Sequence, residues 1–167
     1  MSVLSASTLE SLYQTLTSEI EDYRQLVVLT HQERAALQSG NLDDLIGTVQ
    51  KKETLLTRLN KWEKARQQLM AHLAALLKLS TTISLADVLA FCDEGIAPKL
   101  SALRQEFLAL SEQVRSLTQG NQLLLQAELV RVDATVNYLL SDVTPGNYHA
   151  NSTPRLPVAG NVLNWRV

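Results

Sequence analysis

Apolar residues recur every three or four positions over three long stretches of the chain, and this spacing is the strongest constraint on its fold. The stretches run from Leu9 to Leu37, from about Leu42 to Leu79, and from about Pro98 to Leu139. This spacing places apolar side chains along one side of an α-helix, and a helix with an apolar side must pack against another element. The sequence therefore predicts an all-α protein, an elongated antiparallel bundle of three long helices plus one short helix.

The first corner carries a helix-stop signal followed at once by a helix-start signal. Gly40 follows Ser39, and glycine readily takes the left-handed conformation that ends helices. Asn41 can then cap the next helix. Such a short connection between two long helices predicts an αα-hairpin.

The second connection is longer and contains a helix of its own. Ser84 and Asp87 form an acidic variant of the capping box, which predicts a short helix from Leu85 to Asp93. Pro98 fits the first turn of the last long helix, where its missing N–H is not needed.

The second long helix is predicted to face the first with one apolar side, and to turn its basic side to solvent. The apolar side comprises Leu42, Leu45, Val49, Leu56, Leu59, Leu69, Leu73 and Leu76. The opposite side carries Lys51, Lys52, Lys61, Lys64 and Gln67.

From Thr144 onward the chain is rich in Pro, Gly, Asn and Ser and loses the helical period. We therefore expect two parts, a helical bundle domain over residues 1–142 and a mobile C-terminal tail over residues 143–167.

Composition and charge argue against several classes of partner. The chain has 15 Lys and Arg against 17 Asp and Glu, so no positive field is available to hold nucleic acid. Its most apolar stretch, Leu69 to Leu79, is interrupted by His72 and Lys78, and the first residues lack the pattern of a secretory signal. We expect no membrane insertion and a cytoplasmic location, which the single cysteine, Cys92, also fits.

No group of residues in the sequence has the spacing of a catalytic or metal site. His31, His72 and His149 lie on three separate segments, and no glutamate is followed three residues later by histidine, as di-iron bundles require. Cys92 has no basic neighbour that would activate its thiol. The prediction is a binding protein with no catalytic residue, no metal and no cofactor.

The segment from Leu123 to Leu140 has more apolar surface than one helix contact needs. Leu125, Leu129, Val132, Val136 and Leu139 share one side, and Ala127, Val130 and Ala134 extend another. A helix that is apolar on more than one side must be surrounded or must have a partner. Burial within the chain's own bundle or in a homodimer, and binding of another protein's helix, both satisfy this requirement.

Asn121 falls in register with the apolar residues of the last long helix, where the spacing changes and forms a stutter. Two interpretations follow. Asn121 either faces solvent at a bend beside Gly120, or it lies in the apolar seam and sets the register of packing.

Two stretches of sequence resemble motifs of the FlgN family of flagellar export chaperones. Lys52-Glu53-Thr54-Leu55-Leu56 with Leu59, Glu63 and Arg66 is similar to the pattern K-x-x-L-L-x-x-L-x-x-x-E-x-x-R of that family's second helix. Leu117 to Asn121 with Leu124 and Leu125 resembles the L-x-x-x-N-x-x-L-L signature of its last helix. Tyr148 resembles the family's tail tyrosine, although Ser152 replaces the usual glycine after it and Thr81 to Ala97 is longer than usual.

The resemblance implies a chaperone that binds the C-terminal helices of hook–filament junction proteins and delivers them to the flagellar type III export gate. Glu63, Arg66 and Asn121 would then be structural signature residues, and Tyr148 would dock on the gate. We expect cargo to bind the apolar side formed by Leu125, Leu129, Val132, Val136 and Leu139. The alternative is a homodimeric structural or regulatory protein.

Overall fold

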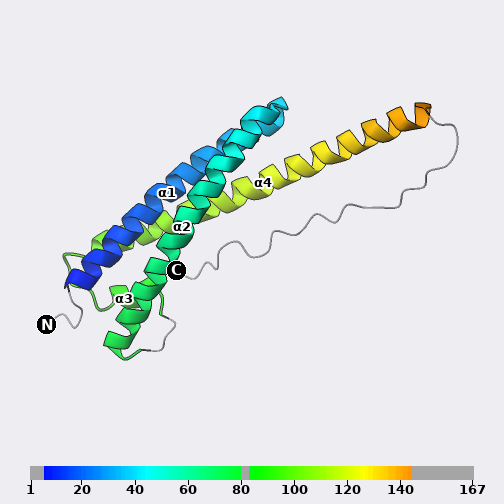
Figure 1. Cartoon of the computed structure of the whole chain (residues 1–167). Coiled ribbons are helices and arrows are strands. Elements are labelled where there is room, and N and C mark those ends of the chain that lie inside the picture. The colour runs from blue at the N-terminus through cyan, green and yellow to red at the C-terminus, as the bar shows by residue number, and fades with distance from the viewer. Residues whose placement is uncertain (1–5, 80–82, 144–167) are drawn as a thin grey trace.

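The computed structural model describes residues 6–79 and 83–143, which form four helices and no strand. Helices α1 (Ala6–Ser39) and α2 (Leu42–Leu77) make an antiparallel hairpin, α3 (Leu85–Leu89) is a single short turn, and α4 (Ala97–Val143) runs back parallel to α1 (Figure 1). The all-α fold with three long helices is confirmed. Of the predicted mobile tail, residues 143–167, Val143 belongs to α4, and residues 144–167 lie outside the described residues.

The hairpin corner forms as its sequence predicts. Gly40 has φ 68°, the left-handed conformation that ends α1. The Asn41 side chain accepts a hydrogen bond from the backbone N–H of Asp44 at 3.1 Å and so caps α2.

The short helix is shorter than predicted. Ser84 and Asp87 do form a capping box, but α3 ends at Leu89 rather than at Asp93. The N–H groups of Phe91 and Cys92 bond to carbonyls three residues back, so the chain tightens into turns. The Asp93 carbonyl accepts hydrogen bonds from the backbone N–H groups of Ile96 and Ala97, so Asp93 lies at the entrance to α4 rather than in α3.

The core consists of two apolar clusters stacked along α1. Near α3, side chains from α1, α2, α3 and α4 pack together: Leu9, Leu12, Leu16, Leu73, Leu85, Val88 and Leu100. Midway along the bundle a second cluster joins α1, α2 and α4: Ile20, Tyr23, Leu26, Leu55, Leu59, Phe107 and Val114. The rings of Tyr23 and Phe107 meet edge to face, with centroids 5.1 Å apart. α1 therefore contributes to every layer of the core.

The apolar side predicted for α2 is wrong for half of its eight residues. Leu59 and Leu73 are buried, but Leu42, Val49, Leu56 and Leu76 are exposed. The buried side of α2 includes Thr48, Leu55 and Leu59. Polar side chains also lie on this side and bond to α1, as Arg66 does with Glu19. Lys52, predicted to face solvent, instead donates to Glu33 of α1 at 2.7 Å.

Candidate functional site

The C-terminal half of α4 extends past the end of the hairpin. α1 ends at Ser39, five residues after Arg34, whereas α4 continues from Asn121, which bonds to Arg34, as far as Val143. At about 1.5 Å per residue, this distal half is about 30 Å long. Figure 1 shows it diverging from α1 and α2 as a free-standing helix.

Asn121 bonds α4 to α1 near the start of the distal half. It is 4% exposed, and its amide nitrogen donates to the Thr30 carbonyl at 2.9 Å and to Glu33 Oε2 at 2.7 Å. Its amide oxygen accepts from Arg34 Nε at 2.9 Å. Of the two interpretations of Asn121, the structure supports the polar residue in the seam, and α4 continues as a helix through Gly120 and Asn121.

The contacts of Asn121 extend into a network that joins the three long helices. Glu33 also accepts from Lys52 of α2, and Arg34 Nη2 donates to the Leu117 carbonyl at 3.2 Å. Arg34 lies directly over Gly120, where a Cβ atom would stand 2.3 Å from Nη2. Sequence reasoning identified neither Glu33 nor Arg34. The sequence signal that could have indicated this contact is Gly120, a glycine inside a helix and next to Asn121, because glycine allows another group to approach the backbone closely.

Arg66 forms a second bridge between α1 and α2, deeper in the bundle. Its Nε donates to Glu19 at 2.9 Å, and its guanidinium lies over the Phe107 ring at 5.4 Å from the centroid. Burial raises the pKa of the Glu19 carboxyl, and Arg66 opposes that rise. Glu63, the other predicted signature residue on this helix, is half-buried and accepts from Gln67 at 3.1 Å.

The distal half of α4 presents an exposed apolar surface, which we call the α4 face. The residues predicted to bind cargo lie on it and are all exposed: Leu125 42%, Leu129 45%, Val132 56%, Val136 45% and Leu139 58%. Other apolar side chains on this half are exposed too: Leu123, Val130, Tyr138 and Leu140. Burial of this surface within the bundle is therefore ruled out for the described residues. Exposed apolar surfaces of this kind are often found where proteins bind a partner.

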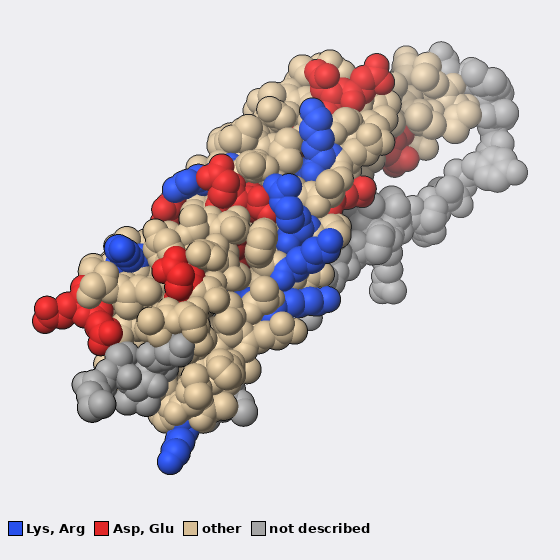
Figure 2. All heavy atoms as spheres, turned by 60° about the vertical axis from the view of Figure 1, so that its left-hand side comes forward, with Lys and Arg blue, Asp and Glu red and all other residues tan. Residues whose placement is uncertain are grey.

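Few charges interrupt this end of the molecule. Glu128 and Arg131 pair with each other at 2.8 Å, and Asp133 is the next charge along the helix. Figure 2 shows Lys and Arg in a row over the hairpin, while the end of α4 is mostly uncharged on the face in view. The distal half is thus suited to contact apolar surface.

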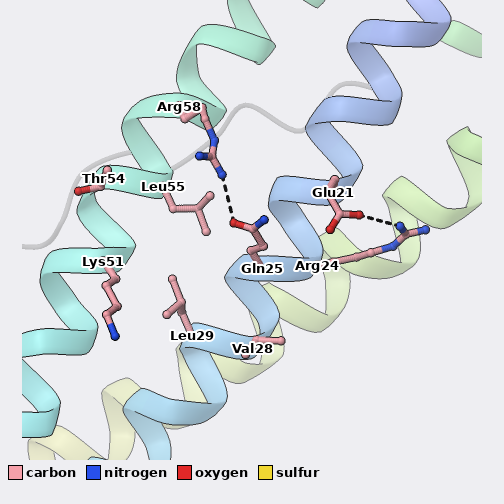
Figure 3. A pocket seen from close by; sticks show the side chains of 9 residues that line it. All are labelled: Glu21, Arg24, Gln25, Val28, Leu29, Lys51, Thr54, Leu55 and Arg58. Carbon is pink, nitrogen blue, oxygen red and sulfur yellow. Dashed lines mark hydrogen bonds and ion pairs between the residues drawn. The ribbon is translucent and has the colours of Figure 1, made fainter.

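A groove between α1 and α2 is one concave feature of the described residues. It has a volume of about 540 Å³ and is lined by Glu21, Arg24, Gln25, Val28, Leu29, Lys51, Thr54, Leu55 and Arg58. In Figure 3 α4 passes behind α1, so the groove opens on the side of the hairpin away from α4. Arg24 pairs with Glu21 and with Glu106 of α4, and Arg58 pairs with Gln25 and Asp22. The groove brings together no set of groups suited to catalysis.

The described residues contain no cluster of three or more His, Cys, Asp or Glu that could hold a metal ion. Burial and the neighbouring Asp93 raise the pKa of the Cys92 thiol, which disfavours the reactive thiolate. In the part of the chain that the structure describes, no helix is both long and apolar enough to cross a membrane. Tyr148 and His149 lie outside the described residues.

Comparison with known proteins identifies one family. The model of the family described as FlgN protein matches residues 1–155, which include all four helices and both sequence motifs. No curated protein and no solved structure matches the chain.

Proposed function

Because the chain belongs to the FlgN family and has the general role of a flagellar export chaperone, we propose that it binds the C-terminal helices of hook–filament junction proteins and delivers them to the flagellar type III export gate. The bound helix lies against the α4 face, defined by Leu125, Leu129, Val132, Val136 and Leu139. No reaction is part of this function, and the protein acts in the cytoplasm.

The exposure of the α4 face is the observation that carries this proposal. Five large apolar side chains on one side of a helix are left without a partner, and each is more than two-fifths exposed. An amphipathic helix of another protein can cover such a side with its own apolar residues. Covering that helix would keep the cargo from assembling or aggregating before export.

The hairpin supports this surface without covering it. The network of Asn121, Glu33 and Arg34 fixes the start of the distal half of α4 to α1. A helix held in position at one end loses less conformational entropy when cargo binds, and this favours affinity. Asn121, Arg66 and Glu63 therefore serve the chaperone as structural residues rather than as cargo contacts.

Delivery to the gate is assigned to Tyr148 in the segment after α4. The tyrosine stands among Pro145, Gly146, Asn147 and Asn151, a run of turn-forming residues. An amphipathic aromatic ring is a frequent anchor at protein interfaces. A short anchor gives modest affinity, which suits a step from which the chaperone must be released.

Isothermal titration calorimetry with purified proteins tests the proposal. A hook–filament junction protein from the same genome should bind the chaperone, and the same protein without its C-terminal helical segment should not. Equal binding of both forms would exclude the C-terminal helix as the ligand. A homodimer is the alternative use of the α4 face, and in sedimentation it would appear as a tight dimer that does not dissociate when the junction protein is added.

A further inference from the structure

A second exposed apolar surface lies on the first half of α2. We call it the α2 stripe, and it consists of Leu42, Ile46, Val49 and Leu56, whose exposed fractions are 65%, 48%, 37% and 36%. These residues were expected to pack inside the bundle, except for Ile46. In the described structure they take no part in either core cluster.

Val49 and Leu56 of the α2 stripe lie near the side of α2 that is turned toward α4. Val49 is three residues before Lys52, and Leu56 is three residues before Leu59, so each pair shares one side of the helix. Lys52 reaches the Glu33 carboxylate that also binds Asn121 of α4, and Leu59 packs in one cluster with Phe107 of α4. By contrast, Lys51 and Thr54 line the groove on the other side of the hairpin.

The α4 face continues the side of α4 that packs in the bundle. Leu117, Asn121, Leu125 and Leu129 follow one another in steps of four, and Leu117 and Asn121 are buried. Beyond Asn121 this side is exposed, with Leu125 at 42% and Leu129 at 45%. The α2 stripe and the α4 face therefore both lie beside the network of Lys52, Glu33 and Asn121, at the level from which α4 diverges from the hairpin in Figure 1.

We propose that the α2 stripe is a second contact for the cargo helix, which lies against α2 and the distal half of α4 together. The inference rests on the proposed function and specifies the ligand further. A helix that contacts two neighbours needs a broad apolar side, wider than the seam of a two-helix contact.

The charges beside the two surfaces indicate what flanks that apolar side. Glu53 lies four residues after Val49 and three before Leu56, and Asp133 lies four after Leu129 and three before Val136. Among the described residues neither carboxylate forms an ion pair. The ligand is therefore an amphipathic helix with Lys or Arg at the edges of its apolar side, positioned to pair with these carboxylates.

Matched substitutions on the two sides of the hairpin test the inference. Val49→Asp should weaken binding of the purified junction protein by about tenfold or more, because a charge is placed in a desolvated contact. Val28→Asp is the control, since Val28 is 54% exposed in the groove on the far side, and it should change affinity by less than about twofold. Glu53→Lys, which perturbs no packing, should weaken binding most at low salt.

The outcomes separate this inference from the proposed function. If the wild-type protein does not bind the junction protein, both fail. If it binds, and Leu129→Asp abolishes binding while Val49→Asp and Glu53→Lys stay within twofold of wild type, only the α2 contact is overturned. Unchanged circular dichroism is required of each variant.

A photo-crosslinking residue in place of Leu56 identifies what covers the α2 stripe. Crosslinks to the C-terminal helix of the junction protein would support the inference. Crosslinks to residues 144–167 of the same chain or to a second copy, or no crosslink in the complex, would overturn it.

Discussion

The guanidinium of Arg34 in α1 lies across the backbone of Gly120 in α4, where even a methyl group would meet it at 2.3 Å. From that position Arg34 donates to the Asn121 side chain and to the Leu117 carbonyl. Glycine lowers the helix propensity at this position of α4, but its lack of a side chain lets Arg34 of α1 approach the α4 backbone. This contact fixes the level at which α4 separates from the hairpin.

Gly120→Ala and Gly47→Ala form a matched pair that tests this contact. Both glycines lie inside long helices, but a Cβ at Gly47 would meet nothing within 4 Å. Gly47→Ala should therefore stabilise the protein by about 0.5–1 kcal/mol through helix propensity. Gly120→Ala should show no gain or a loss, because Arg34 must leave its hydrogen bonds. The free energy of unfolding in urea is the measurement. If Gly120→Ala raised it as much as Gly47→Ala does, Arg34 would be shown to move aside without an energetic cost.

Asn121→Leu should destabilise the bundle although it makes the seam more apolar. The change removes the three hydrogen bonds of the Asn121 side chain, although Glu33 keeps Lys52 and Arg34 keeps the Leu117 carbonyl as partners. Hydrogen bonds contribute about 0.5–1.5 kcal/mol each, and somewhat more when they involve charged groups, so the three together exceed what one leucine gains where the fit is not designed for it. Thermal unfolding should show a lower Tm, and a higher Tm would mean that the network contributes little.

Buried Glu19 should make stability fall as pH rises above the ordinary glutamate range. Burial raises the pKa of Glu19 in the folded state above 4.5, so at intermediate pH the folded protein binds more protons than the unfolded chain. We therefore expect the wild type to lose unfolding free energy relative to Glu19→Gln as the pH rises above about 4.5. The difference should level off once Glu19 is ionised in both the folded and the unfolded state. A difference that increases with pH would show that Arg66 outweighs burial.

Tyr148→Ala should lower affinity for the cytosolic domain of the gate protein while leaving Tm and cargo affinity unchanged. Interface tyrosines often contribute ~2 kcal/mol or more, so the loss should exceed about tenfold in a surface plasmon resonance titration. A lower Tm with gate affinity preserved would instead make Tyr148 a structural residue of the bundle.

The helices and the α4 face could be predicted from sequence because each follows from local patterns. Gly40 and Asn41 define the corner through their own conformations, and the face from Leu125 to Leu139 follows from helical spacing alone. Its exposure could not be predicted, since it depends on where α1 ends relative to α4.

The buried side of α2 could not be predicted from the spacing of apolar residues. Arg66 and Lys52 occupy inward positions because Glu19 and Glu33 of α1 pair with them, and such pairs are visible only once the helices are packed. The apolar residues assigned to that side, Val49 and Leu56 among them, were consequently misplaced, and they became the exposed α2 stripe.

The affinity of Leu129→Asp for a purified hook–filament junction protein tests the central claim most directly. Leu129 is 45% exposed, so an aspartate there should leave Tm within about 2 °C of wild type, as expected for a surface change below 0.5 kcal/mol. In the complex the same charge would be desolvated without a partner, and binding measured by calorimetry should fall by about a hundredfold or become undetectable. Wild-type affinity in a variant with wild-type circular dichroism would contradict the assignment of the α4 face as the cargo site.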